Sequence, residues 1–494
     1  MNKTRHTAIR ARGLLSVLAI ASLAACTAGP DFRRPAAPDV SAYTSTALPA
    51  QTVAAEGLLG QAQHFQPGAV VDRQWWRALG SAELDDWIAQ ALAASPNLAA
   101  ARATLRQAEE LHSARAGSTL YSQIEASAGA GRQRVTPSAQ GLPGDAREYS
   151  LYNAGIGISY RLDLAGANRR ALETLAARTE YRAHELAGAQ LSLAARITSA
   201  AITRARLAGQ IEAVESLVKA QDEQLALTRQ RVRLGQLAPV EVPALQAQLE
   251  QTRARLPTLR KQMEQSEHLL AVLAGQPPGV ARAPAFTLDK FRLPTELPLT
   301  LPSELVRQRP DILAAEALVH AANAEYGVAV ARLYPQLTLS ASLGSQALSA
   351  GALFGGGSAV WALVGQLTQP LFNPGLPAEK RAALAAFDAA AANYQVVVLG
   401  ALQEVADSLR ALDHDAQALA ALATADAAAQ TSLASVQRQH ALGAASYVQL
   451  LVARQQAESN RSELIAARAQ RLTDSAALLQ ALGGGQAGTA ARSS

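Results

Sequence analysis

The sequence is poor in cysteine and in aromatic residues. Its 494 residues contain one cysteine, Cys26, so no disulfide can form within the chain. Aromatic side chains make up 4% of the residues, although 49% are hydrophobic and alanine is prominent among them. Small apolar side chains suit closely packed helices better than a bulky globular core. The fold must therefore gain its stability from packing or from assembly.

The sequence also lacks the motifs of an enzyme or a metal centre. Beyond residue 26, the two closest histidines are His414 and His440, 26 residues apart, which is not a helical metal-ligand spacing. The adjacent carboxylates Asp85-Asp86 and Glu109-Glu110 point in different directions from a helix and suit a solvated face. The run at 355–357 lacks the lysine of a phosphate loop. We expect no catalytic residue, no metal and no bound cofactor.

Little excess charge remains once the first residues are set aside. The formal net charge is +5, but residues 1–25 hold four basic and no acidic side chains. The rest of the chain carries 41 basic against 40 acidic residues. This balance gives no basic footprint for nucleic acid.

The amino terminus has the pattern of an export signal. Four basic residues precede the apolar stretch Leu14 to Leu23, which is too short to remain as a membrane-spanning helix. The stretch closes on Leu23-Ala24-Ala25-Cys26, which resembles a bacterial lipobox, so we expect cleavage before Cys26 and a covalent lipid, such as palmitate, on it. The alternative is an ordinary signal that happens to end in cysteine. Thr27, rather than an aspartate, follows, and the resemblance then implies the outer membrane.

The chain carries one plan twice. Three pairs of features recur at offsets of 208 to 214 residues: Ser95-Pro96-Asn97-Leu98 with Arg309-Pro310-Asp311-Ile312, Gly235 with Gly443, and Gly275 with Gly483. Each half reads as helix, strand, loop, strand, very long helix, tight turn and long helix. A repeat of this length is too long for a solenoid unit and indicates two fused structural halves.

The long helices have coiled-coil periodicity. From Leu245 to Leu273, apolar or small residues recur at alternating steps of four and three, which is an a/d seam. Residues 166–234 contain no proline and would extend about 100 Å as one helix. Pro257 lies inside the next helix, where an interior proline costs roughly 3 kcal/mol unless a bend absorbs it, so we predict a kink there.

Four segments alternate between apolar and polar residues with the period of a strand. They are 124–130, 156–164, 337–343 and 361–371, and polar loops at 132–148 and 346–358 join them in pairs. Strands of about ten residues with one apolar face fit a transmembrane barrel, although each one alone also fits a half-buried soluble sheet. Four strands cannot close, and an open edge in hydrocarbon is costly. Several copies must share one barrel, with eight strands from two chains or twelve from three.

Several ordered motifs resemble those of the TolC-like outer-membrane factors. They are Trp75-Trp76-Arg77, Leu84-Asp85-Asp86-Trp87-Ile88, the segment from Arg309 to Pro335, Leu162-Asp163-Leu164 before Gly166, and Gln369-Pro370-Leu371-Phe372 before Gly375. Cys26-Thr27-Ala28-Gly29-Pro30-Asp31-Phe32 resembles the NodT-type lipoprotein branch. The resemblance implies a mainly α fold with transmembrane β structure: a homotrimer whose twelve-stranded outer-membrane β-barrel continues as a periplasmic α-helical barrel.

The same resemblance implies a function and its partners. It predicts a passive, gated efflux duct, coupled through a periplasmic adaptor protein to an inner-membrane pump of the RND type. A lipid-anchored adaptor with a coiled-coil hairpin is the alternative, and a lipid-anchored enzyme is a weaker one. The exported cargo stays open.

The resemblance also assigns roles to the two helix turns. It places the periplasmic tips and the adaptor-docking surface at Leu234, Gly235, Leu237, Leu442, Gly443 and Ser446. Relatives commonly close the pore with a hydrophobic residue and an aspartate, at positions that match Val448 and Val452. The aspartate is missing, so we expect an apolar constriction with Arg454 nearby, and Glu241 of the first hairpin as a partner for that arginine.

The sequence divides into six parts. They are a signal at 1–25, a lipidated extension at 26–71, a first repeat at 72–275, a proline-rich connector at 276–302, a second repeat at 303–484 and a tail at 485–494. The extension either wraps the outside of the fold or is disordered.

Overall fold

A computed structural model describes residues 27–484 except 138–140 and 142. The predicted signal, Cys26 and the predicted tail lie outside these residues. The chain forms two compact units. The first gathers residues up to 35, 104–182 and 315–394; the second gathers 36–103, 183–314 and residues from 395 onward.

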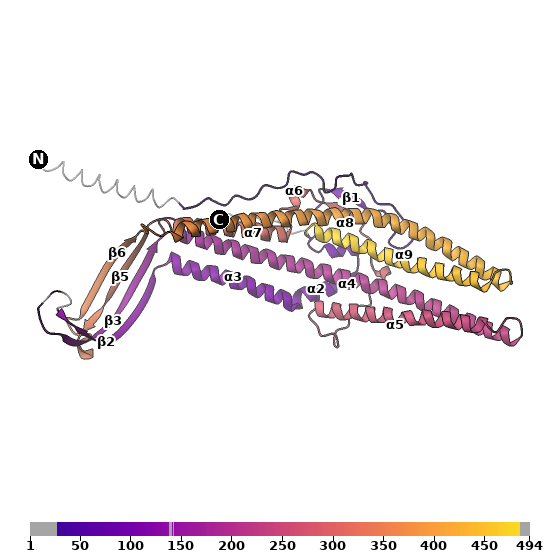
Figure 1. Cartoon of the computed structure of the whole chain (residues 1–494), viewed down its shortest axis with the longest axis horizontal. Helices are drawn as coiled ribbons and strands as arrows, with labels where there is room; N and C mark the ends of the chain where they lie inside the picture. The colour runs from indigo at the N-terminus through magenta and orange to yellow at the C-terminus, as the bar shows by residue number, and fades with distance from the viewer. Residues whose placement is uncertain (1–26, 138–140, 142, 485–494) are drawn as a thin grey trace. The chain divides into compact units, whose positions relative to one another are not determined.

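The first unit contains a four-stranded antiparallel sheet (Figure 1). Its strands are β2 (Gln123–Val135), β3 (Arg147–Leu162), β5 (Gln336–Ala347) and β6 (Ala359–Thr368). The order is β2-β3-β5-β6, so the two repeats meet at the β3-β5 pair. Strands β2 and β6 form the two edges, and each is paired on one side only.

The strand register collects the apolar residues on one face of the sheet. Ile124 lies opposite Ile158, which lies opposite Ala341, which lies opposite Leu363. In the neighbouring row, Trp361 is 78% exposed. The rows between carry small and hydroxyl side chains, such as Ser159 opposite Ser340. The predicted alternation is confirmed, and it produces an apolar face and a polar face.

Several strand boundaries differ from the prediction, and β6 ends at Thr368 rather than at residue 371. Strands β2 and β3 extend beyond their apolar residues, because Arg132 Nη2 and Glu148 Oε2, 3.1 Å apart, continue the ladder as a cross-strand ion pair. Strand β3 ends at Leu162 because the Asp163 carboxylate accepts hydrogen bonds from the backbone N–H groups of Asn168 and Arg169. Those bonds cap the next helix.

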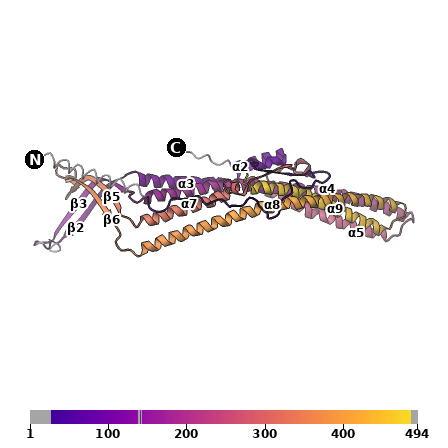
Figure 2. The same ribbon diagram turned by 90° about the horizontal axis from the view of Figure 1, so that it is seen from above.

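The helices repeat the predicted plan. The first repeat has α3 (Pro96–Leu120), α4 (Ala167–Arg233) and α5 (Glu241–Leu273), and the second has α7 (Pro310–Ala331), α8 (Gly375–Ala441) and α9 (Tyr447–Ala481). Helices α4 and α8 are each 67 residues long. Each continues through a tight turn into α5 or α9 and forms a hairpin with it (Figures 1 and 2).

The coiled-coil seam of α5 is the face that packs. Leu245, Leu249, Thr252, Ser266 and Leu270 are buried, whereas most residues between the seam positions are exposed. Leu245 and Leu249 form an apolar cluster with α4. Helix α5 is continuous through Pro257, and the bend there stays a prediction.

Residues 36–71 of the extension pack within the second unit through a short sheet and a buried arginine. Strand β1 (His64–Pro67) pairs in parallel with β4 (Glu296–Leu299) of the connector. Arg471 of α9 is fully buried and donates hydrogen bonds to Thr52 Oγ1 at 3.0 Å and Gln63 Oε1 at 2.8 Å. These contacts favour the wrapped alternative for described residues 36–71. Short elements complete the fold: η1 (Trp75–Leu79), α2 (Ala82–Ala94), η3 (Leu288–Lys290), α6 (Pro302–Leu305) and η4 (Ala350–Ala352).

A second buried arginine explains the motif that opens the second repeat. Arg309 bonds the Asp311 carboxylate, Glu404 Oε2 at 2.8 Å and the Ala481 carbonyl at 2.9 Å. It therefore ties the start of α7 to α8 and to the end of α9. Burial lowers the pKa of Arg309, but hydrogen bonds with Asp311 and Glu404 outweigh this and raise it.

Candidate functional site

The two helical hairpins close with the same turn. Gly235 and Gly443 adopt left-handed conformations, with φ of 73° and 74°. The N–H of Gln236 donates to the Arg231 carbonyl at 2.9 Å, and the N–H of Ala444 donates to the Gln439 carbonyl at 2.8 Å. This is the Schellman pattern of helix ends. The predicted glycine caps are thus present in both repeats.

The predicted docking residues differ in exposure between the two tips. Leu442 and Leu234 are 84% and 64% exposed, whereas Leu237 is partly covered. Ser446 starts α9 with a capping box, since its hydroxyl accepts from the Gln449 N–H and the Gln449 side chain accepts from the Ser446 N–H. The start of α5 has no side-chain cap. Each tip therefore exposes a leucine, and only the second turn is followed by a helix with a side-chain cap.

Gly235→Ala or Gly443→Ala should destabilise the hairpins, because alanine is strained in the left-handed backbone conformation. A Cβ on Gly235 or Gly443 would meet no atom within 4 Å, so the expected cost is the left-handed conformation, about 1–2 kcal/mol. Thermal unfolding should detect it. The matched control is Gly400 inside α8, which also has open space around it, and Gly400→Ala should instead stabilise by about 0.5–1 kcal/mol. Equal effects at Gly443 and Gly400 would contradict the assignment.

The predicted constriction residues occupy two faces of α9. Val448 and Val452, one helical turn apart, are 67% and 62% exposed. Tyr447 and Leu450 point the other way, and Leu450 is 2% exposed. Arg454 shares this second face by its helical spacing, and burial lowers its pKa. Val448 and Val452 thus lie on a different face from Arg454, which the prediction placed near them.

Tyr447 joins the second hairpin to the first. Its ring packs on the cluster of Leu225, Leu245 and Leu249. Its hydroxyl is buried without a hydrogen-bond partner among the described residues. Burial raises the pKa of Tyr447 to about 12, with Arg454 lowering it and Glu241 raising it.

The predicted ion pair between Glu241 and Arg454 is not formed among the described residues. Both charges instead act on the Tyr447 hydroxyl. Two other contacts link the hairpins: Arg255 pairs with Glu458, and Gln210 Nε2 donates to Ser462 Oγ at 3.3 Å.

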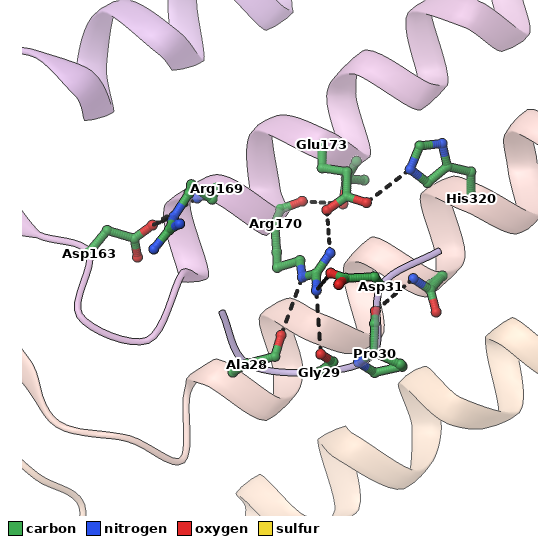
Figure 3. Close-up of polar contacts among 11 residues, drawn as sticks. Ala28, Gly29, Pro30, Asp31, Asp163, Arg169, Arg170, Glu173 and His320 are labelled. Atoms are coloured by element: carbon green, nitrogen blue, oxygen red, sulfur yellow. Dashed lines mark hydrogen bonds and ion pairs between the residues drawn. The ribbon is translucent and has the colours of Figure 1, made fainter. Parts of the chain in front are cut away.

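A third site holds the chain just after Cys26. Arg170, in the first turn of α4, has a side chain 4% exposed (Figure 3). Its guanidinium donates to the carbonyls of Ala28 and Gly29 and pairs at 2.7 Å with both Asp31 and Glu173. Burial lowers the pKa of Arg170, but the bonds to these two carboxylates outweigh this effect and raise it.

The other walls of this anchor site come from α4 and α7. His320 stacks on Phe32 with ring centroids 4.3 Å apart. Its Nε2 forms a hydrogen bond with Glu173 (Figure 3). A Cβ on Gly29 would lie 2.7 Å from the Gly327 Cα, so the two backbones touch. The sequence motif around Cys26 indicated its lipidation, but nothing in it identified Arg170 or Gly327 as its support.

The sheet supplies a polar surface but no chemical centre. Ser159, Ser340 and Ser342 line a shallow hollow on the polar face, together with Glu125 of the edge strand. No group of three or more potential metal ligands occurs in the part of the chain that the structure describes.

Comparison with known proteins identifies the family. The family model described as outer membrane efflux protein matches residues 87–276 and 301–484, one match for each repeat. The chain belongs to this family. The pyoverdine export outer membrane protein OpmQ of Pseudomonas aeruginosa is 32% identical over 84% of this chain and 87% of its own length. The probable outer membrane lipoprotein SilC of Salmonella typhimurium is 26% identical over 96% of this chain and 98% of its own.

A solved structure shows the same architecture. The outer-membrane channel OprN superposes with a TM-score of 0.83 at 27% identity, covering 93% of this chain and 99% of OprN. This outer membrane efflux protein is therefore an outer-membrane channel, and the adaptor alternative is not favoured. Its duplicated strand pair and long hairpin are confirmed as the family fold.

Proposed function

We propose that three copies of this chain form one gated duct through the outer membrane. The observation that carries the proposal is the sheet with an apolar face and two edges, β2 and β6, each paired on one side only. In hydrocarbon, every unpaired backbone group on such an edge costs several kcal/mol. Pairing β6 of one copy with β2 of the next removes all edges, and three copies give the twelve strands that the family resemblance implies.

The long helices support the same assembly. Helix α8 is the one helix among the described residues that is long and apolar enough to cross a membrane, yet only 11% of that apolar window is buried inside the single chain. Val396 and Leu399 on it are 68% and 65% exposed. Covering this face with a neighbouring copy explains its composition without placing a helix in the bilayer, and it builds the α-helical barrel.

The segment that follows the predicted lipid anchor is bound next to the end of β3. The Ala28 N–H donates to the Ala165 carbonyl at 2.8 Å, between the end of β3 and the start of α4. Residue 26 precedes this docked segment by two positions, so the docked segment would hold a lipid on Cys26 close to the sheet. The palmitate and thioether-linked chains would then enter the periplasmic leaflet beside the barrel.

The tips and the constriction complete the mechanism. Leu234 and Leu442 at the bare tips offer apolar contact to a periplasmic adaptor, which couples the duct to an inner-membrane pump of the RND type. The exposed pair Val448 and Val452 forms an apolar ring that excludes water when the tips converge. Flow through the duct is passive, and the pump chooses the cargo. Gate opening requires the hairpins to separate at Tyr447.

Reconstitution tests this proposal. The purified lipoprotein should run as a trimer by native mass spectrometry in detergent and should add discrete conductance steps to a planar bilayer. A cysteine pair placed on β2 and β6 should cross-link neighbouring copies. A monomer that adds no conductance would favour the lipid-anchored adaptor alternative and overturn the duct.

A further inference from the structure

Three arginines of α9 lie along one wall of a large cavity. Arg454, Arg461 and Arg468 are separated by seven residues each, so they share one face of the helix. The cavity has a volume of about 950 Å³. Helices α4 and α5 of the first hairpin and α8 and α9 of the second provide its walls. It lies wholly within the second unit.

The positive charge of this wall is poorly neutralised. Arg461 lies 3.7 Å from Asp426, a loose ion pair. Among the described residues, no carboxylate pairs with Arg454 or Arg468, and the Nε of Arg468 is buried without an acceptor. Burial lowers the pKa of Arg468 and the charge of Arg461 lowers it further, and the opposing effect of Asp426 does not offset them. Two cations thus repel each other in a partly desolvated place.

The acidic groups of the cavity do not supply the missing charge. Glu458 is already paired with Arg255. Glu212 and Asp289 are exposed to solvent, and hydrogen bonding by Thr287 lowers the pKa of Asp289. The half-buried guanidinium groups of Arg454 and Arg468 therefore keep donors that a bound oxyanion would satisfy.

We propose that this arginine-lined cavity binds a phosphate-bearing anion between the two hairpins. Guanidinium groups present paired N–H donors that match the oxygens of a phosphate. The cavity is large enough for a ligand bigger than a phosphate ion. Free phosphate and a phospholipid headgroup both carry the required phosphate group. Because the ligand would touch both hairpins, its occupancy would stabilise their contact. This inference does not depend on the trimeric duct.

Tryptophan-detected thermal unfolding of the detergent-solubilised protein tests the site. Sodium phosphate should raise the Tm saturably above sodium chloride of equal ionic strength and pH. The double variant Arg454→Gln/Arg468→Gln should lose this shift. The matched control Arg260→Gln should keep the phosphate-induced shift. It changes an exposed arginine of the first hairpin, which pairs with Glu215 of that hairpin. A short-chain phosphatidic acid that gives a larger shift than phosphate would assign the site to a headgroup.

The Tm in sodium chloride distinguishes a binding role of the arginines from a structural one. In chloride, the double variant should unfold at the wild-type temperature or above, because it removes two uncompensated, partly buried charges. A lower Tm in chloride would mean that the arginines already have partners, such as carboxylates of a neighbouring copy, and would overturn the site. An equal phosphate shift in the double variant would reveal an adventitious ion only. Bilayer conductance of the same preparations reports the duct separately.

Discussion

The double variant Val448→Ala/Val452→Ala should raise the closed-state ion conductance of the channel severalfold in planar bilayers. Both valines are exposed on one face of α9 in the single chain, so no side chain of their own hairpin covers them. In a converged ring, their methyl groups narrow and dry the passage, and alanine removes two methyl groups per position. The widened, less apolar ring should hold water and pass ions.

Controls distinguish the ring from a general loosening of the helices. Val280→Ala changes an exposed valine of the connector, outside both hairpins, and should leave the closed-state conductance unchanged. Tyr447→Phe removes a hydroxyl that is buried without a partner, so it should also have little effect on conductance. If the double valine variant and the wild type have the same closed-state conductance, the constriction lies elsewhere.

The fold was largely predictable because its signals are periodic and repeated. Alternating residues in β3 and β5, the seam that starts at Leu245, and two turn glycines at equal offsets each report a local rule of packing or backbone geometry. The strand ends were less predictable. Strands β2 and β3 continue through Arg132 and Glu148, where a cross-strand ion pair replaces the apolar alternation.

The candidate sites were only partly predictable, because tertiary contacts decide them. Arg454 follows Val452 by two residues, so helical spacing alone puts the two side chains on different faces. The sequence did not indicate that Tyr447 would pack against the first hairpin, near Glu241. Arg170 had no sequence signal, because its partners at 28–31 lie about 140 residues earlier. Such a contact becomes visible only once the chain is folded.

Arg170→Ala should free the segment that follows the lipid-bearing cysteine. The substitution removes the bonds to the carbonyls of Ala28 and Gly29 and the ion pair with Asp31. Hydrogen bonds to a charged group contribute about 1.5–3 kcal/mol each, and a loss of about 3 kcal/mol raises the undocked population on the order of a hundredfold. Trypsin should then cleave after Arg33 much faster, which mass spectrometry of the released lipopeptide would measure.

Two further variants make the role of Arg170 specific. Gly327→Ala should accelerate the same cleavage by another route, because its Cβ would lie 2.9 Å from the Arg170 Cδ and displace the side chain. Arg178→Ala, which changes a 54% exposed arginine paired with Glu325, should leave the rate unchanged, since surface ion pairs contribute little. Asn323 Nδ2 also donates to the Pro30 carbonyl at 3.0 Å. If Arg170→Ala is cut no faster than Arg178→Ala, then this bond, the Phe32 stacking and the Gly29–Gly327 contact hold the segment without the arginine.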